Sequence, residues 1–109
     1  MGFMRRLLLV ATVGVILTAT TIPALAATRG AELHDNFFRP ASLTVQSGDT
    51  LRFRWRGRAR HNVTVTKGPQ RFRSPSKTSG SYQRRVTRRG SYRLVCTLHS
   101  GMRMSLRVR

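Results

Sequence analysis

Acidic residues, lysine and histidine are scarce in this sequence. Its 109 residues include 21 Lys+Arg against 3 Asp+Glu and 3 His, which gives a formal net charge of +18. Only Lys67 and Lys77 are lysines, so arginine carries almost all of the positive charge. Selection for anion binding explains this composition, because guanidinium pairs well with phosphate and carboxylate. A genome-wide preference for arginine explains it equally well, because the arginines are spread along the whole chain.

Cysteine is limited to a single residue, Cys96, so the chain has no internal disulfide. Small exported domains commonly depend on disulfides because their cores are limited. A lone cysteine in such a domain indicates a free thiol, a link in a dimer or a metal ligand.

The start of the chain has the layout of a secretory signal peptide. Arg5-Arg6 precedes an apolar run over residues 7–19, and Ala24-Leu25-Ala26 matches the small-x-small cleavage pattern. The apolar run is shorter than the roughly 20 residues of a membrane-spanning helix, so a retained anchor is the less favoured alternative. We therefore predict a signal peptide over residues 1–26 and a single domain over 27–109, exported to a periplasm, a cell wall or the medium.

The predicted domain contains no convincing helix pattern and many short alternations of apolar and charged residues. Leu51, Phe53 and Trp55 alternate with arginines, which predicts a strand with one buried and one charged face. Residues 67–80 contain turn residues without apolar periodicity and are predicted to form a long loop. About seven strands and an all-β sandwich or barrel follow. The predicted strands cover residues 31–34, 43–45, 50–56, 61–66, 81–86, 91–96 and 102–108.

The segment from Cys96 to Met102 holds a thiol, the imidazole of His99 and a thioether within seven residues. This soft donor set favours copper, and a blue-copper site needs two His and one Cys with a long axial Met. Structural zinc sites usually use more Cys or His at paired spacing. The second histidine must come from elsewhere in the chain. His61 is the best candidate, because it lies at the start of a predicted strand, directly after the polar segment 56–60. His34 is expected to face solvent on the first strand and to have no role.

With these residues, the chain resembles the plastocyanin and amicyanin branch of the cupredoxins. The resemblance covers nearly all of the predicted domain and is specific because several motifs occur in the family's order. These are Asp35-Asn36-Phe37-Phe38-Arg39-Pro40, Leu43-Thr44-Val45, Gly48-Asp49-Thr50, Phe53 and Trp55, His61-Asn62-Val63, Gly90 and Tyr92 ahead of Cys96 and His99, and Gly101-Met102.

The resemblance implies a Greek-key β-sandwich that binds one copper ion, cycling between Cu(I) and Cu(II). His61, Cys96 and His99 would be equatorial ligands, and Met102 would be axial. Met104 stands where the family often has glycine, and it is the alternative axial ligand. Asn62 would not bind the copper itself, but would connect the ligand loop to the strand of His61.

Two further expectations concern the surroundings of the ligands. The ring of His99 would be the ligand edge nearest solvent, in a patch with Leu98 and Gly101. Arg58 and Arg60 lie close to His61 in the sequence and are expected to raise the reduction potential, because positive charge disfavours Cu(II).

Electron transfer between redox partners is the leading functional hypothesis. The positive charge would steer an acidic redox protein, and the chain is expected to be a monomer. A copper carrier or scavenger without a redox partner is one alternative. A basic module that binds anionic polymers or membrane surfaces is another, with nonspecific but not specific nucleic-acid binding. An independent enzyme is not expected, because three histidines are too few for the trinuclear cluster of multicopper oxidases.

Overall fold

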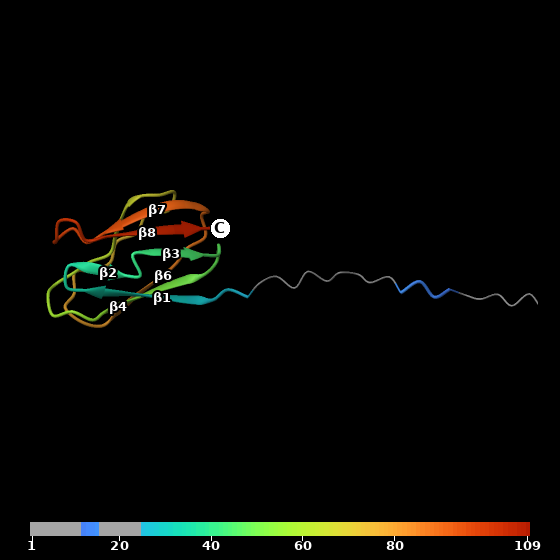
Figure 1. Ribbon diagram of the computed structural model, residues 1–109, viewed down its shortest axis with the longest axis horizontal. Coiled ribbons are helices and arrows are strands. Elements are labelled where there is room, and N and C mark those ends of the chain that lie inside the picture. The colour runs from blue at the N-terminus through green and yellow to red at the C-terminus, as the bar shows by residue number, and fades with distance from the viewer. Residues whose placement is uncertain (1–11, 16–24) are drawn as a thin grey trace, which may run out of the picture.

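The computed structural model describes residues 12–15 and 25–109, and within them it contains eight β-strands (Figure 1). The strands are short and follow one another closely, as the spacing of turn residues predicts. They are β1 (Thr28–His34), β2 (Phe37–Arg39), β3 (Ser42–Val45), β4 (Thr50–Trp55), β5 (Thr64–Lys67), β6 (Ser81–Arg85), β7 (Gly90–Val95) and β8 (Arg103–Val108).

The strands form two four-stranded sheets with the orders β2-β1-β4-β6 and β3-β8-β7-β5. Pairing is parallel between β1 and β4 and between β3 and β8, and antiparallel elsewhere. Strands that are neighbours in a sheet are often distant in sequence, so the chain crosses between the sheets repeatedly. The predicted all-β sandwich is confirmed.

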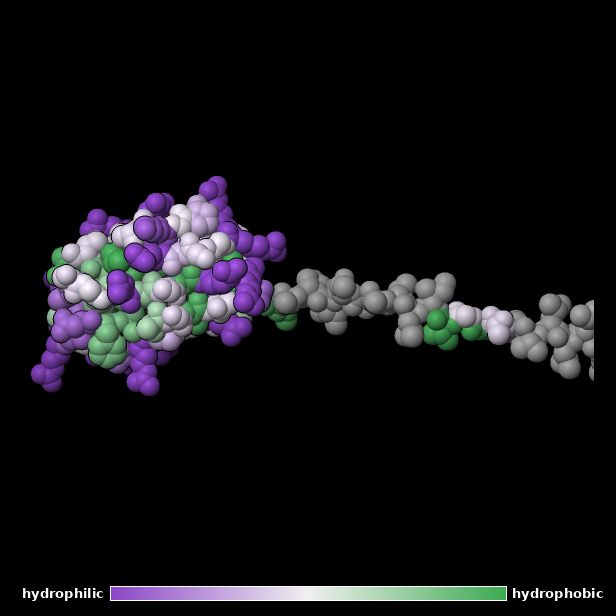
Figure 2. Space-filling model, turned by 45° about the horizontal axis from the view of Figure 1, so that its top comes forward, coloured by the Kyte–Doolittle hydropathy of each residue, from purple (hydrophilic) through white to green (hydrophobic). Residues whose placement is uncertain are grey.

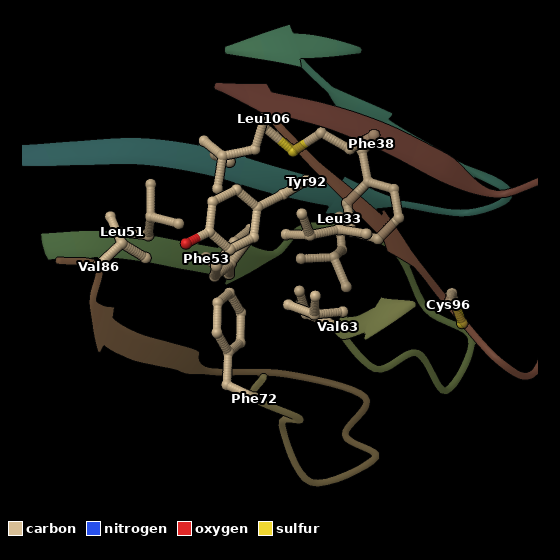
Figure 3. Close-up of a cluster of buried hydrophobic side chains, with 14 of the residues drawn as sticks. Leu33, Phe38, Leu51, Phe53, Val63, Phe72, Val86, Tyr92, Cys96 and Leu106 are labelled. Atoms are coloured by element: carbon tan, nitrogen blue, oxygen red, sulfur yellow. The ribbon is translucent and has the colours of Figure 1, made fainter. Parts of the chain in front are cut away.

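Alternation of side chains along the strands creates the core between the sheets. In β4, Leu51, Phe53 and Trp55 are buried, while the arginines between them point outward. The same period of two buries Leu106 and Val108 in β8. Figure 3 shows the buried cluster, with Cys96 at one side of it, away from Leu51 and Val86. The cysteine therefore lies where the core ends and a loop begins.

Three features of the fold differ from the expectation. The structure has eight strands rather than about seven, because Phe37–Arg39 pairs with β1 although only Phe38 of this segment is buried. A strand does not begin at His61: that residue forms an isolated bridge with Lys77, and β5 starts at Thr64. The predicted loop over 67–80 also supplies a core residue, Phe72, which is 7% exposed.

Different parts of the chain lie at the two ends of the sandwich. The β7–β8 loop lies at one end, whereas the start of β1 and the C-terminus lie at the other (Figure 1).

Most of the predicted signal peptide over residues 1–26 falls outside the described residues, and it stays a prediction. In the part of the chain that is described, no helix is both long and apolar enough to cross a membrane.

Candidate metal centre

Three metal-donor side chains from two distant parts of the chain meet at the end of the sandwich. The His61 and His99 Nδ1 atoms are 3.1 Å apart, and the Cys96 Sγ lies 3.9 Å from the first and 3.6 Å from the second. Donor atoms that share a small ion through bonds of about 2.0–2.3 Å have separations of about this size. The structure thus brings together the three predicted equatorial ligands.

The chemistry of these atoms fits a metal better than a hydrogen-bond network. The His61 Nε2 is 2.9 Å from the Asp35 carboxylate, which only accepts hydrogen bonds, so this nitrogen is the donor. The Nδ1 of the neutral ring then presents a lone pair toward Cys96 and His99. A soft sulfur and two imidazole nitrogens form the donor set of a His₂Cys copper site.

The position of His61 is fixed by contacts on several sides. Its backbone N–H donates to the Lys77 carbonyl, and the Lys77 N–H donates back, both at 2.9 Å. The indole Nε1 of Trp55 donates to the His61 carbonyl at 3.0 Å. The imidazole is fully buried. His61 therefore has little freedom to move, although it lies in no regular strand.

Asp35 is a component of the site that sequence reasoning missed. Its carboxylate accepts hydrogen bonds from His61 and from the backbone amides of Ala59 (2.9 Å) and Arg58 (3.1 Å). The bond to His61, followed by those to the two amides, lowers the pKa of Asp35 from 3.8 to about 2. Its place in the first family motif was a signal, but nothing in the sequence indicated contact with His61.

The second ligand-bearing segment is the loop between β7 and β8. The Cys96 N–H donates to the Met102 carbonyl at 3.0 Å, and the Met102 N–H donates to the His99 carbonyl at 3.3 Å. Gly101 has a φ of 82°, a conformation that glycine adopts without steric cost. These contacts fold the loop so that both donors face the same point.

Asn62 connects the two segments, as the resemblance implied. Its Nδ2 donates to the Thr97 Oγ1 at 2.7 Å, and its Oδ1 accepts the Thr97 N–H at 3.2 Å. The side chain is fully buried, and its Oδ1 also accepts the Thr64 hydroxyl at 2.9 Å. Since Asn62 follows His61 and Thr97 follows Cys96, this contact sets the distance between the ligands.

The two candidate axial methionines are both buried but lie in different places. Met102 precedes β8 and borders the same surface hollow as Cys96 and His99. Met104 lies within β8, opposite Leu94 of β7, and borders a different hollow. The placement favours Met102, which stays the predicted axial ligand.

Among the three ligand side chains, only His99 is partly exposed. Leu98 beside it is 49% exposed, and the left end of the domain in Figure 2 shows hydrophobic residues among hydrophilic ones. His34 lies apart from the cluster: its ring stacks on Phe37 with centroids 4.7 Å apart, and its Nε2 lies 3.4 Å from Glu32. It is partly covered rather than directed freely into solvent.

Comparison with known proteins identifies the family. The family model for copper-binding proteins of the plastocyanin/azurin family matches residues 26–109. The chain belongs to the plastocyanin/azurin family. The family and the cluster of His61, Cys96 and His99 together fit one copper ion, with Met102 adjacent in the loop. A comparison with curated proteins found no match.

Solved structures of other proteins share the fold. A reduced amicyanin variant is 24% identical, with a TM-score of 0.68 over 75% of this chain and 82% of the other. The purple cupredoxin of Nitrosopumilus maritimus is 18% identical, with a TM-score of 0.67 over 73% and 98%. The copper-containing nitrite reductase of Thermus scotoductus SA-01 is 25% identical, with a TM-score of 0.64 over 78% of this chain. This chain spans only 22% of that reductase.

Proposed function

We propose that this protein is an exported single-electron carrier whose copper is held by His61, Cys96, His99 and Met102. The convergence of two imidazole Nδ1 atoms and one thiol, all within 3.9 Å of one another, is the observation that supports this most directly. When bound, copper supplies a one-electron couple between Cu(II) and Cu(I). The protein supplies ligands that hydrogen bonds from Trp55, Lys77 and Asn62 hold in position.

Fixed ligands suit electron transfer because little rearrangement accompanies the change of charge. The contacts of Trp55 and Lys77 hold His61, and Asn62 holds the Cys96 loop. His99 supplies a route to the surface, because its ring is partly exposed and its neighbour Leu98 offers an apolar contact. We expect a partner to dock on this patch.

The partner we propose is an acidic redox protein. Without Arg5 and Arg6, residues 27–109 carry 19 of the 21 Lys+Arg against 3 Asp+Glu, a net charge of +16. This charge would raise the association rate with a negatively charged surface, and salt would lower that rate. Export rests on the sequence pattern over residues 1–26. Export and the positive charge together predict a carrier that works outside the cytoplasm, in a periplasm, a cell wall or the medium.

The direct test is the absorption spectrum of the purified protein with one equivalent of Cu(II), followed by ascorbate and then an oxidant. An intense visible band that ascorbate bleaches and the oxidant restores is expected from thiolate-to-copper charge transfer. A protein that binds no copper would contradict the proposal, and anion binding through the arginine-rich surface would then become the leading function.

A copper carrier without a redox partner is the second candidate, because it would use the same donor cluster of His61, Cys96 and His99. The two functions differ in their dependence on redox chemistry. A carrier is expected to bind Cu(I) and pass it to a chelating partner without a change in oxidation state. An electron carrier keeps its copper through repeated cycles of reduction and oxidation.

A further inference from the structure

The three acidic side chains of this strongly basic protein all have defined partners. Glu32 accepts a hydrogen bond from Arg56 at 2.8 Å. Asp35 accepts one from His61 at 2.9 Å. Asp49 is 2% exposed and accepts hydrogen bonds from two backbone amides, those of Ala27 and Gln46, at the end of the sandwich opposite the metal centre. Two of these carboxylates, Asp35 and Asp49, lie beside groups that the proposed function involves: a ligand imidazole and the residue after the predicted cleavage point.

We propose that Asp35 is a positioning residue that orients His61 and lowers the reduction potential of the copper centre. The inference rests on His61 being a copper ligand, as proposed above. Asp35 accepts a hydrogen bond from the Nε2–H of His61, so Nδ1 is left to bind the metal. A carboxylate on the far nitrogen makes an imidazole a stronger ligand. Its fixed negative charge also favours Cu(II), the more positive oxidation state.

The surrounding backbone is shaped to hold this carboxylate. The amides of Arg58 and Ala59 donate to it, and Asn36 turns the chain directly after it with a φ of 74°. A Cβ added at Gly57 would lie 2.7 Å from the Asp35 Cγ, closer than real Cβ contacts allow. Glycine at position 57 therefore gives the carboxylate room to reach His61.

Charge around His61 makes this contact more important. Arg58 and Arg60 are expected from the sequence to raise the potential, but the guanidinium of Arg60 donates to the Ser76 carbonyl at 3.1 Å. Among the described residues, Asp35 is the charged side chain that contacts a ligand imidazole directly. Its effect on the copper should therefore be larger than that of either arginine.

The test compares Asp35→Asn with Glu32→Gln, which removes the same charge from the same region without touching His61. Loss of a contact of this kind typically weakens metal binding tenfold or more. We expect the preference for Cu(II) over Cu(I) to fall about tenfold in Asp35→Asn, which equals a rise of about 59 mV for a one-electron couple. Glu32→Gln should shift the potential much less.

Equal shifts in the two variants would overturn the inference while leaving the blue-copper function intact. Absence of a reversible blue band in the unmodified protein would instead reject the proposed function. Should Asp35→Asn not fold, Gly57→Ala keeps every charge but displaces the carboxylate. An unchanged potential in Gly57→Ala would likewise overturn the role of Asp35, and a raised one would support it.

A different observation carries a second inference, at the far end of the sandwich. The Asp49 Oδ1 accepts the backbone N–H of Ala27 at 2.9 Å, and its Oδ2 accepts that of Gln46 at 2.9 Å. The carbonyl of Ala27 accepts the N–H of Thr50, also at 2.9 Å. The residue directly after the predicted cleavage point is thus already docked against a buried carboxylate.

We infer that Asp49 receives the new amino terminus released by cleavage after Ala26, which rests on the proposed export. Hydrolysis breaks the peptide bond between Ala26 and Ala27, leaving a carboxylate on the first and an ammonium group on the second. The same nitrogen that donated as an amide then donates as a cation. Charge-assisted bonds of this kind are shorter and stronger than neutral ones. Cleavage after Ala26 would therefore strengthen the contact that holds the start of β1 against Asp49.

The test measures how much Asp49→Asn destabilises the exported protein and a form that retains Ala26 ahead of Ala27. Mass spectrometry of the exported protein is expected to show Ala27 as its first residue. Asp49→Asn removes the Arg29–Asp49 ion pair at 3.8 Å from both forms. It should lower the folding equilibrium constant about tenfold more in the exported protein, because only there does it also remove the ion pair with the new ammonium group. Equal losses in both forms, or a different first residue, would overturn the inference and leave the copper function untouched.

Discussion

The two segments that bring ligands to the metal centre are held in different ways. His61 is fixed by separate parts of the fold: Trp55 on its carbonyl, Lys77 on its backbone and Asp35 on its ring. The loop from Cys96 to Met102 is closed by two hydrogen bonds between its own backbone groups and is tied to the rest of the fold by two bonds between Asn62 and Thr97. The first ligand therefore depends wholly on tertiary contacts, whereas the loop ligands depend on a short stretch of sequence together with one tertiary contact.

The largest effect should come from the loop. Cys96→Ser removes the thiolate but keeps nearly the same size at a buried position, so the fold should persist. We expect the intense blue band to disappear completely, because charge transfer from sulfur produces it. Absorption with Cu(II) and circular dichroism measure the two properties. A Cys96→Ser protein that stayed blue would falsify the assignment of Cys96 as a ligand.

Asn62→Ala tests the link between the two segments. The Thr97 amide and hydroxyl would lose their bonds to Asn62, and each such hydrogen bond contributes about 0.5–1.5 kcal/mol. Copper affinity should fall about 10- to 100-fold, since contacts of this kind orient the ligands. Titration with copper measures the affinity, and unfolding by denaturant measures the stability.

Thr64→Val is the matched control for Asn62→Ala, because Thr64 donates to the same Oδ1 without reaching the loop. It should affect copper affinity much less. If the two variants lost affinity equally, Asn62 would act through general stability of the domain and not through its bond to the loop.

Trp55→Phe tests how firmly the fold holds His61. The change keeps a buried aromatic ring but removes the indole N–H that donates to the His61 carbonyl. We expect a loss of about 1 kcal/mol in unfolding free energy. The blue band should stay almost unchanged, because the Lys77 amide still holds that carbonyl. A large spectral shift would show that the indole bond alone positions the ligand.

The smallest effect on the copper is expected from Asp49, which lies at the opposite end. Hydrogen bonds from the Ala27 and Gln46 amides lower the pKa of Asp49 below 3.8. This carboxylate therefore contributes stability that is present above about pH 4 and is lost as pH falls through the lowered pKa. Unfolding midpoints across acidic pH should fall less steeply in Asp49→Asn. The blue band at neutral pH should not change, and identical pH profiles would refute this account.

Prediction from sequence succeeded where a residue's role depends on its close neighbours. The alternation over Leu51 to Trp55 predicted a half-buried strand, and the spacing from Cys96 to His99 predicted two donors on one loop. The short strand Phe37–Arg39 was missed because only Phe38 marks its buried face. Phe72 was missed because it lies in a loop with no periodic pattern, so nothing local indicated its burial.

The sequence by itself determined the β-sandwich class, the soft donor set and the identity of the family. Alternating side chains and a short motif are local properties, and they act wherever the rest of the chain lies. Tertiary structure alone decided that Asp35 contacts His61 and that Asp49 holds Ala27. Both contacts join residues more than 20 positions apart. Such contacts depend on strand pairing and loop direction, because the carboxylate and its hydrogen-bond donors become neighbours only when the sheets have formed.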